Sequence, residues 1–326
     1  MRASHSRIVL TIATAGLLAV TGTVQAAPVG MLKQFKVPQP SSPNYITEGS
    51  DGNFWFTDSP GALDQFVGRV TPSGDVSVFT VCDSCFPNDI AQGPDGVLYF
   101  THNNAPLGRI TTAGVPLPDA GAPFQFTSNH LAVSGRSVWI TDFNADVIWR
   151  YDIDAETFSS FAPPTPGSNP GDIAVASDGV VWFTQNNPNQ IASLDPSTGA
   201  FTETLIPSDG QPRSIAVATD GSVWFTELVV DRVGRLDPVT HQISEFSVGV
   251  EGVDEETAEI AAAPDGSLWF TQAFAGNIAR IDASGQVTAV SKAVKGSEPQ
   301  GIVVATNGDP WYVDSAGGKV AALRLR

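Results

Sequence analysis

Two histidines carry the clearest capacity for proton transfer in this sequence. His102 and His130 fall in neighbouring repeats, and the acidic residues Asp89 and Asp142 lie close to them in the same pattern. An imidazole oriented by a carboxylate is a common general base in enzymes. We therefore take His102, His130 and Asp142 as candidate catalytic residues. A purely structural role for each histidine stands as the equal alternative.

Acidic side chains outnumber basic ones. The chain holds 34 Asp and Glu against 17 Lys and Arg, a net charge of −17 at pH 7. Such a surface argues against nucleic acid or an anionic membrane as a partner. Clustered carboxylates suit a hard divalent cation such as Mg²⁺ or Ca²⁺. The densest run is 251–256, followed by Glu259, and a merely solvated loop is the alternative for that run.

A repeat must position these side chains. Seven aromatic residues recur at intervals of 40 to 45 residues. They are Trp55, Tyr99, Trp139, Trp182, Trp224, Trp269 and Trp311. Six of them stand three residues after the glycine of an Asp-Gly or Asn-Gly pair, which is typical of a tight turn between antiparallel strands. The period predicts an all-β fold, a seven-bladed β-propeller of four-stranded antiparallel blades.

The ends of the chain predict how the ring closes. The seventh repeat stops at Arg326 after its third strand, whereas 32–37 resembles a fourth strand without a blade. We expect this N-terminal strand to complete the last blade, because closure removes the exposed edges of an open ring. Residues 27–326 then form a single propeller domain.

The first 26 residues have the pattern of a secretory signal peptide. Arg2 and Arg7 precede an apolar run that is too short to span a bilayer. Small residues at 24 and 26 then match a signal-peptidase cleavage site after Ala26. We therefore expect a secreted protein, periplasmic or extracellular, that works as a monomer. Cys82 and Cys85 are the only cysteines, and in an exported chain they favour a local disulfide over redox or zinc chemistry.

One end of the ring is the expected site, because first strands start and second strands end there. The second-strand ends are all polar, namely Asp58, His102, Asp142, Gln185, Glu227, Gln272 and Asp314. The first strands start at Asn44, Asn88, Asn129, Gly171, Arg213, Ala258 and Gln300, and Tyr45, Asp89, His130, Asp172, Ser214, Glu259 and Gly301 follow them. From these residues we predict substrate contacts by Asp58, Asn88, Arg213, Glu227, Glu259, Gln272 and Gln300. The alternative is a ring of carboxylates that only solvates the mouth of a channel.

The repeat also resembles a known family. Residues 215–227 read Ile-Ala-x-x-x-Asp-Gly-x-x-Trp-Phe-Thr-Glu, and 233–236 supply a following Gly-Arg strand. This unit is similar to that of the streptogramin lyases (the virginiamycin B lyase family), and the likeness covers all seven repeats. The resemblance implies a Mg²⁺-dependent elimination that opens a cyclic depsipeptide.

That family carries its metal and base in a Glu-Pro-His-Gly-Ile motif and at a second-strand carboxylate. This sequence reads Glu-Pro-Gln-Gly-Ile over 298–302, and Asp314 ends the strand that follows. The resemblance therefore implies Glu298 and Asp314 as metal ligands. Gln300 stands where the family has its catalytic histidine, and an amide cannot act as a general base at neutral pH.

Two functions remain open on this reasoning. One is a divalent-metal-dependent lyase or lactone-opening enzyme that acts on a small or macrocyclic molecule, with His102 or His130 replacing the lost base. The other is a non-catalytic propeller whose polar face binds a ligand or a protein.

Overall fold

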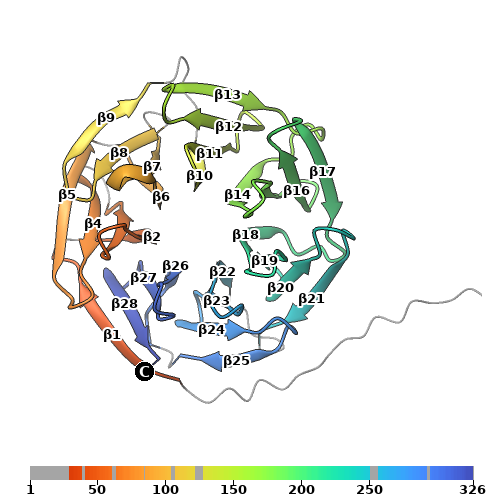
Figure 1. Cartoon of the computed structure of the whole chain (residues 1–326). Helices are drawn as coiled ribbons and strands as arrows, with labels where there is room; N and C mark the ends of the chain where they lie inside the picture. Colours follow the sequence, from red (N-terminus) through yellow and green to blue (C-terminus); the bar gives the residue numbers. More distant parts are fainter. Residues whose placement is uncertain are drawn as a thin grey trace, which may run out of the picture.

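The computed structural model describes residues 29–38, 41–60, 64–83, 85–103, 107–121, 128–249, 256–291 and 294–325. Within them, seven four-stranded antiparallel sheets stand around a central axis (Figure 1). The predicted seven-bladed β-propeller is therefore confirmed. The predicted signal peptide, residues 1–26, and the acidic residues 251–255 lie outside the described residues.

The two inner strands of every blade connect through the predicted turns. The innermost strands are β2 (Pro43–Glu48), β6 (Pro87–Gln92), β10 (Ser128–Ser134), β14 (Pro170–Val175), β18 (Pro212–Val217), β22 (Thr257–Ala262) and β26 (Pro299–Val304). The second strands are β3 (Phe54–Asp58), β7 (Val97–His102), β11 (Ser137–Asp142), β15 (Val181–Gln185), β19 (Val223–Glu227), β23 (Leu268–Gln272) and β27 (Pro310–Asp314). The glycine of each Asp-Gly or Asn-Gly pair has a positive φ, as at Gly221 with φ 84°.

The two outer strands complete each blade. The third strands are β4 (Asp64–Val70), β8 (Leu107–Thr111), β12 (Val147–Asp152), β16 (Gln190–Asp195), β20 (Arg232–Leu236), β24 (Asn277–Ile281) and β28 (Lys319–Arg324). The outermost strands are β5 (Val76–Asp83), β9 (Pro116–Ala120), β13 (Thr157–Phe161), β17 (Ala200–Leu205), β21 (Ile243–Ser247), β25 (Val287–Val290) and β1 (Met31–Lys36). Helix in the described ranges is limited to the short 3₁₀ turn η1 (Pro94–Gly96), and no helix there is long and apolar enough to cross a membrane.

The N-terminal strand closes the ring as expected. β1 pairs antiparallel with β28, from Met31 opposite Arg324 to Lys36 opposite Lys319, so the last blade contains both ends of the described chain (Figure 1). The aromatic anchors fill the spaces between blades. Trp311 of β27, for example, is fully buried in a cluster with Phe54 and Phe56 of the first blade. Packing of large aromatic surface between neighbouring sheets holds the ring together.

Every innermost strand has a β-bulge at the same place. The register between β18 and β19 passes from Pro212 opposite Glu227 to Ile215 opposite Phe225, which leaves one extra residue on β18. The same shift occurs in the other six inner strands. A bulge re-aims side chains and is common beside functional sites. The inner strands begin at one end of the channel, which we call the mouth face. In each blade the bulge directs the second and third residues of the inner strand toward this face.

Buried threonines hold these bulges in place. In six blades a second-strand threonine hydroxyl accepts the N–H of the third residue of the inner strand, at 2.9 to 3.2 Å. The Thr226 hydroxyl also donates to the Ala258 carbonyl of the next blade, at 2.8 Å. In the seventh blade Val313 occupies the threonine position. The Trp-Phe-Thr strands therefore supply a hydrogen bond that holds the bulge, in addition to apolar packing.

Candidate functional site

The polar residues that end the second strands do not line the channel. All seven are buried, and their partners lie on the outer strands or in loops. Asp58 accepts hydrogen bonds from the Ser41 hydroxyl and the Ser42 N–H, and Gln185 donates to Glu203 of β17. The inner strand of each blade lies between these residues and the channel, and the substrate contacts by Asp58, Glu227 and Gln272 stay predictions. Glu227 binds Ser208, and Gln272 donates to the Val248 carbonyl.

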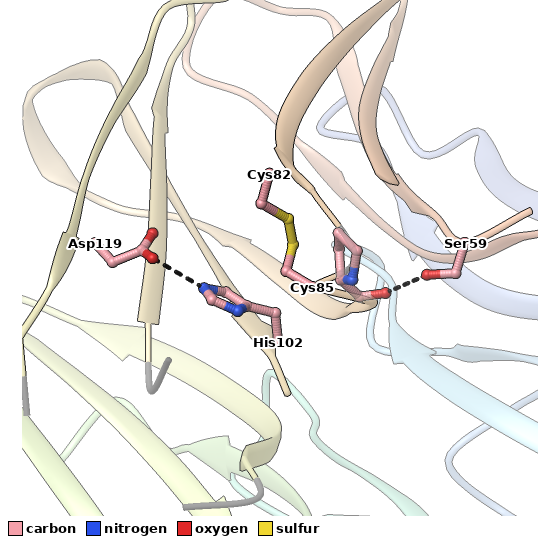
Figure 2. The surroundings of a disulfide bond; sticks show 6 residues. Ser59, Cys82, Cys85, His102 and Asp119 are labelled. Atoms are coloured by element: carbon pink, nitrogen blue, oxygen red, sulfur yellow. Dashed lines mark hydrogen bonds and ion pairs between the residues drawn. A yellow bond between two sulfur atoms is a disulfide. The ribbon is translucent and has the colours of Figure 1, made fainter. Parts of the chain in front are cut away.

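His102 pairs with a carboxylate that the sequence pattern did not indicate. Its Nε2 lies 3.5 Å from Oδ2 of Asp119 on β9 (Figure 2). Asp142 instead accepts the Ala145 N–H at 3.0 Å and faces the indole N–H of Trp149 at 3.4 Å. Each of the two residues therefore has local contacts of its own. Their catalytic roles stay predictions.

The expected disulfide lies beside the His102 pair. Cys82, near the end of β5, is joined to Cys85 in the loop before β6 (Figure 2). The Cys85 carbonyl accepts the Asn103 N–H at 3.0 Å, and Cys85 is buried. Together these contacts fix the loop between the first and second blades.

The third residues of the inner strands meet in the channel. They are Tyr45, Asp89, His130, Asp172, Ser214, Glu259 and Gly301, and we call the first six the channel cluster. His130 Nδ1 lies 3.6 Å from Oδ2 of Asp89 and 3.4 Å from Oδ1 of Asp172. The Ser214 hydroxyl lies 2.8 Å from Asp172 and 2.8 Å from Glu259. Tyr45 contacts the His130 ring edge to face, with ring centres 5.2 Å apart.

The channel cluster also fastens each inner strand to the next. Asp89 accepts the N–H of Leu131 at 2.9 Å, and Asp172 accepts that of Ile215 at 2.8 Å. Gly301 takes the seventh place because a Cβ there would lie 2.6 Å from the Asn44 carbonyl oxygen of the first blade. The cluster therefore has a structural role in ring closure whatever else it does.

Burial and mutual repulsion set the protonation of the channel cluster. Burial raises the pKa of Glu259 to about 8, and the Asp172 carboxylate adds to that rise while His130 opposes it. Burial by itself would lower the pKa of His130, but Asp172 and Asp89 outweigh it and raise the pKa to about 9. His130 is therefore protonated at neutral pH in this arrangement, and a protonated imidazole is not a general base.

A second polar layer lies above the cluster at the mouth. Arg213 of β18 forms an ion pair with Glu256 at 3.0 Å. Its other terminal nitrogen donates to the amide oxygen of Gln300 on β26, at 3.1 Å. One guanidinium thus reaches from the fifth blade to the seventh. Among the predicted substrate contacts, this layer contains Arg213 and Gln300, and Asn88 occupies the matching inner-strand position of the second blade.

Glu298 and Asp314, the implied metal ligands, lie next to each other at the same face. Asp314 Oδ1 accepts the Glu298 N–H at 2.9 Å, and the Glu298 side chain is exposed. Asp314 is fully buried, and its Oδ2 has no hydrogen-bond partner among the residues that the structure describes. Mg²⁺ is commonly held by one or two carboxylates together with water. The buried Asp314 oxygen and the exposed Glu298 carboxylate are oxygen donors of the kind that such an ion takes.

The sequence predicts the residues of the channel cluster as neighbours of the site and not as its centre. The signal was the conserved spacing within each repeat, in which a Pro or Thr precedes an Ile or Leu by three residues in all but one blade. The three-residue spacing on the inner strand faces two residues on the second strand, which is the bulge. Asp119 and Ser208, by contrast, are brought to His102 and Glu227 only by the fold.

The chain is similar to known proteins in both fold and sequence. Among curated proteins none matches the chain. A solved streptogramin B lyase superposes with a TM-score of 0.82 at 26% identity, over 91% of this chain and 98% of that one. A catalytically inactive histidine-to-alanine variant of virginiamycin B lyase from Staphylococcus aureus, solved with quinupristin, matches at 0.81 and 25% identity, over 91% and 99%. The model of the virginiamycin B lyase family matches residues 22–130 and 131–326, and the chain belongs to that family.

Proposed function

We propose that this propeller binds a macrocyclic peptide or depsipeptide over its mouth and does not open the ring by elimination. The observation that carries the proposal is the contact between Arg213 and Gln300. The place of the family's base is taken by an amide whose oxygen already accepts a hydrogen bond. Such a group orients a ligand but cannot remove a proton from it.

The mouth face offers both polar and apolar contacts to such a ligand. Arg213, Glu256 and Gln300 form its polar centre. Large apolar side chains are exposed at the same face: Phe86 at 42%, Val229 at 55% and Phe274 at 63% lie on connections, and Leu205 at 64% ends the outer strand β17. A macrocyclic peptide carries amide groups and apolar side chains on one compact ring. The quinupristin complex of the S. aureus relative supports this ligand class.

A cation bound by Glu298 and Asp314 would polarise a ligand carbonyl. Elimination also needs a base at the carbon that loses its proton. His130 lies in the channel cluster with its pKa raised to about 9, so it does not accept a proton near neutral pH. The lyase alternative therefore lacks a base among the groups described at the mouth.

Calorimetric titration with quinupristin tests the binding. We expect one site per chain and a loss of at least tenfold in affinity for Arg213→Ala, because a charged hydrogen bond is worth about 1.5–3 kcal/mol. Arg136→Ala is the matched control, since Arg136 pairs with two acids in the turns at the opposite face. No heat of binding, or an equal loss in both variants, would contradict the proposal.

We also propose that the protein is exported and works as a monomer. The leader pattern of residues 1–26 and the Cys82–Cys85 disulfide support export. Sequencing of the mature N-terminus is expected to start at Ala27, and light scattering is expected to give the mass of one chain. An uncleaved N-terminus or a dimer would contradict these two points.

A further inference from the structure

We propose that the channel cluster binds one divalent cation of the first transition row, with His130, Asp89 and Asp172 as its protein ligands. This site is separate from Glu298 and Asp314 at the mouth, and it does not depend on the proposed ligand. Among the described residues it is the one group of three or more His, Cys, Asp or Glu side chains whose donor atoms all lie within 4.8 Å of one another.

The distances fit a shared cation better than hydrogen bonds. His130 Nδ1 lies 3.4 and 3.6 Å from the two aspartate oxygens, beyond the usual 2.7–3.2 Å of an N–H···O hydrogen bond. Two donors that each lie about 2.1 Å from one metal are separated by roughly 3–4 Å. The nitrogen has no hydrogen-bond partner in the structure. A cation that displaces the imidazole proton would satisfy this nitrogen from between the three groups.

The charge balance of the cluster points the same way. Three carboxylates, those of Asp89, Asp172 and Glu259, face a single imidazole inside the ring. Glu259 is 8% exposed and its Oε2 binds Ser214, while its Oε1 has no hydrogen-bond partner within the described part of the chain. Buried carboxylates require a counter-charge or protons. A dication held by Asp89, His130 and Asp172 supplies that charge beside the unpaired imidazole nitrogen.

The ligand oxygens are held in advance by the fold. Asp89 accepts backbone N–H groups from Ile90 and Leu131, and Asp172 accepts those of Ile173 and Ile215. Contacts of this kind orient metal ligands and raise affinity. The bulge in each inner strand fixes them at the same depth in the channel. A cation there would join the second, third and fourth blades.

The donor set indicates which cation to expect. One imidazole nitrogen with carboxylate oxygens suits Zn²⁺ or Mn²⁺, whereas Mg²⁺ and Ca²⁺ prefer oxygen alone. We therefore take Zn²⁺ as the probe for affinity and Co²⁺ as the probe for spectroscopy. The mouth pair has no nitrogen donor, so the two sites differ in their spectra.

The test is a Zn²⁺ titration of the full mature protein after metal removal. We expect one tight site per chain, and a loss of about 10- to 100-fold in affinity for His130→Ala and for Asp172→Asn. His102→Ala is the matched control, because His102 is a buried histidine that faces one carboxylate outside the channel. His241→Ala controls for an exposed imidazole. These two control variants are expected to keep the affinity of the wild type.

Bound Co²⁺ gives a second readout that does not require every variant to be stable. Its visible absorption is expected to report a nitrogen ligand in the wild type and in Asp314→Asn, and to change in His130→Ala. Asp89→Asn offers a further near-isosteric variant if Asp172→Asn does not fold. Absence of stoichiometric Zn²⁺ binding to the wild type overturns the proposal. Equal binding by His130→Ala and His102→Ala overturns it as well.

Discussion

Replacement of Thr226 by valine tests the physical origin of the bulges. Valine has the shape of threonine but no hydroxyl. In the wild type this hydroxyl accepts the Ser214 N–H at 3.1 Å and donates to the Ala258 carbonyl at 2.8 Å. Thr226 is fully buried, so no water replaces either partner. The variant leaves a buried N–H without an acceptor and weakens a link between the fifth and sixth blades.

The expected cost follows from these two contacts. An unsatisfied buried polar group costs roughly 1–3 kcal/mol, and a typical hydrogen bond contributes about 1 kcal/mol. We expect Thr226→Val to lower the free energy of unfolding by about 2–3 kcal/mol, measured by urea denaturation. Thr202→Val on the outer strand β17 is the control, because Thr202 is exposed. Its expected effect is within about 0.5 kcal/mol of zero.

Thr226→Ser separates loss of the hydroxyl from loss of the methyl group. It keeps both hydrogen bonds, so it is expected to retain more stability than the valine variant. A Thr226→Val protein as stable as Thr202→Val would refute the view that these threonines hold the bulges.

Three further variants test other parts of the fold. Burial raises the pKa of Glu227 to about 7, with the Ser208 hydrogen bond opposing and the Glu245 carboxylate adding to the rise, so the folded chain binds this proton more tightly than the unfolded chain. Wild-type stability should therefore fall as pH rises from about 4.5 to about 7. Glu227→Gln has no such proton to lose, so over this pH range its free energy of unfolding should fall by roughly 2–3 kcal/mol less than that of the wild type. A difference between the urea midpoints of the two proteins that does not change with pH would contradict this. Gly301→Ala should cost roughly 1–3 kcal/mol in the same assay, since its Cβ would meet the Asn44 carbonyl oxygen at 2.6 Å, and a neutral effect would show that the two blades separate easily. Removal of the chain before residue 38 takes away β1 and should lower the thermal midpoint or cause aggregation, whereas an unchanged midpoint would mean that the ring does not need this closure.

The repeat made the fold predictable because its signals are local. An aromatic residue three positions after an Asp-Gly pair specifies a hairpin whose second strand is buried, and this recurs at Trp55, Trp224 and Trp269. The closing strand was predictable from a count of strands alone. The seventh repeat has only three strands and would leave an exposed edge, and pairing with 32–37 covers that edge.

The candidate site was less predictable because a single bulge changes which side chains face the channel. Because second strands end where first strands start, Asp58 and Glu227 are predicted as contacts at the mouth, yet Asp58 binds Ser41 and Glu227 binds Ser208, both in loops. His130 stays a predicted candidate, and its partners Asp89 and Asp172 come from two other blades. Contacts between blades depend on the ring as a whole and leave no short pattern in the sequence.

The most direct test of the proposed function is the fate of quinupristin held by the protein. Elimination breaks the ester without adding water, so the opened product keeps its mass and must be identified by chromatographic retention. We predict that wild-type protein in excess, with Mg²⁺ present, binds quinupristin and returns it unopened. Recovery of the ring-opened product, or no binding at all, would contradict the assignment of this mouth as a binding site without a base.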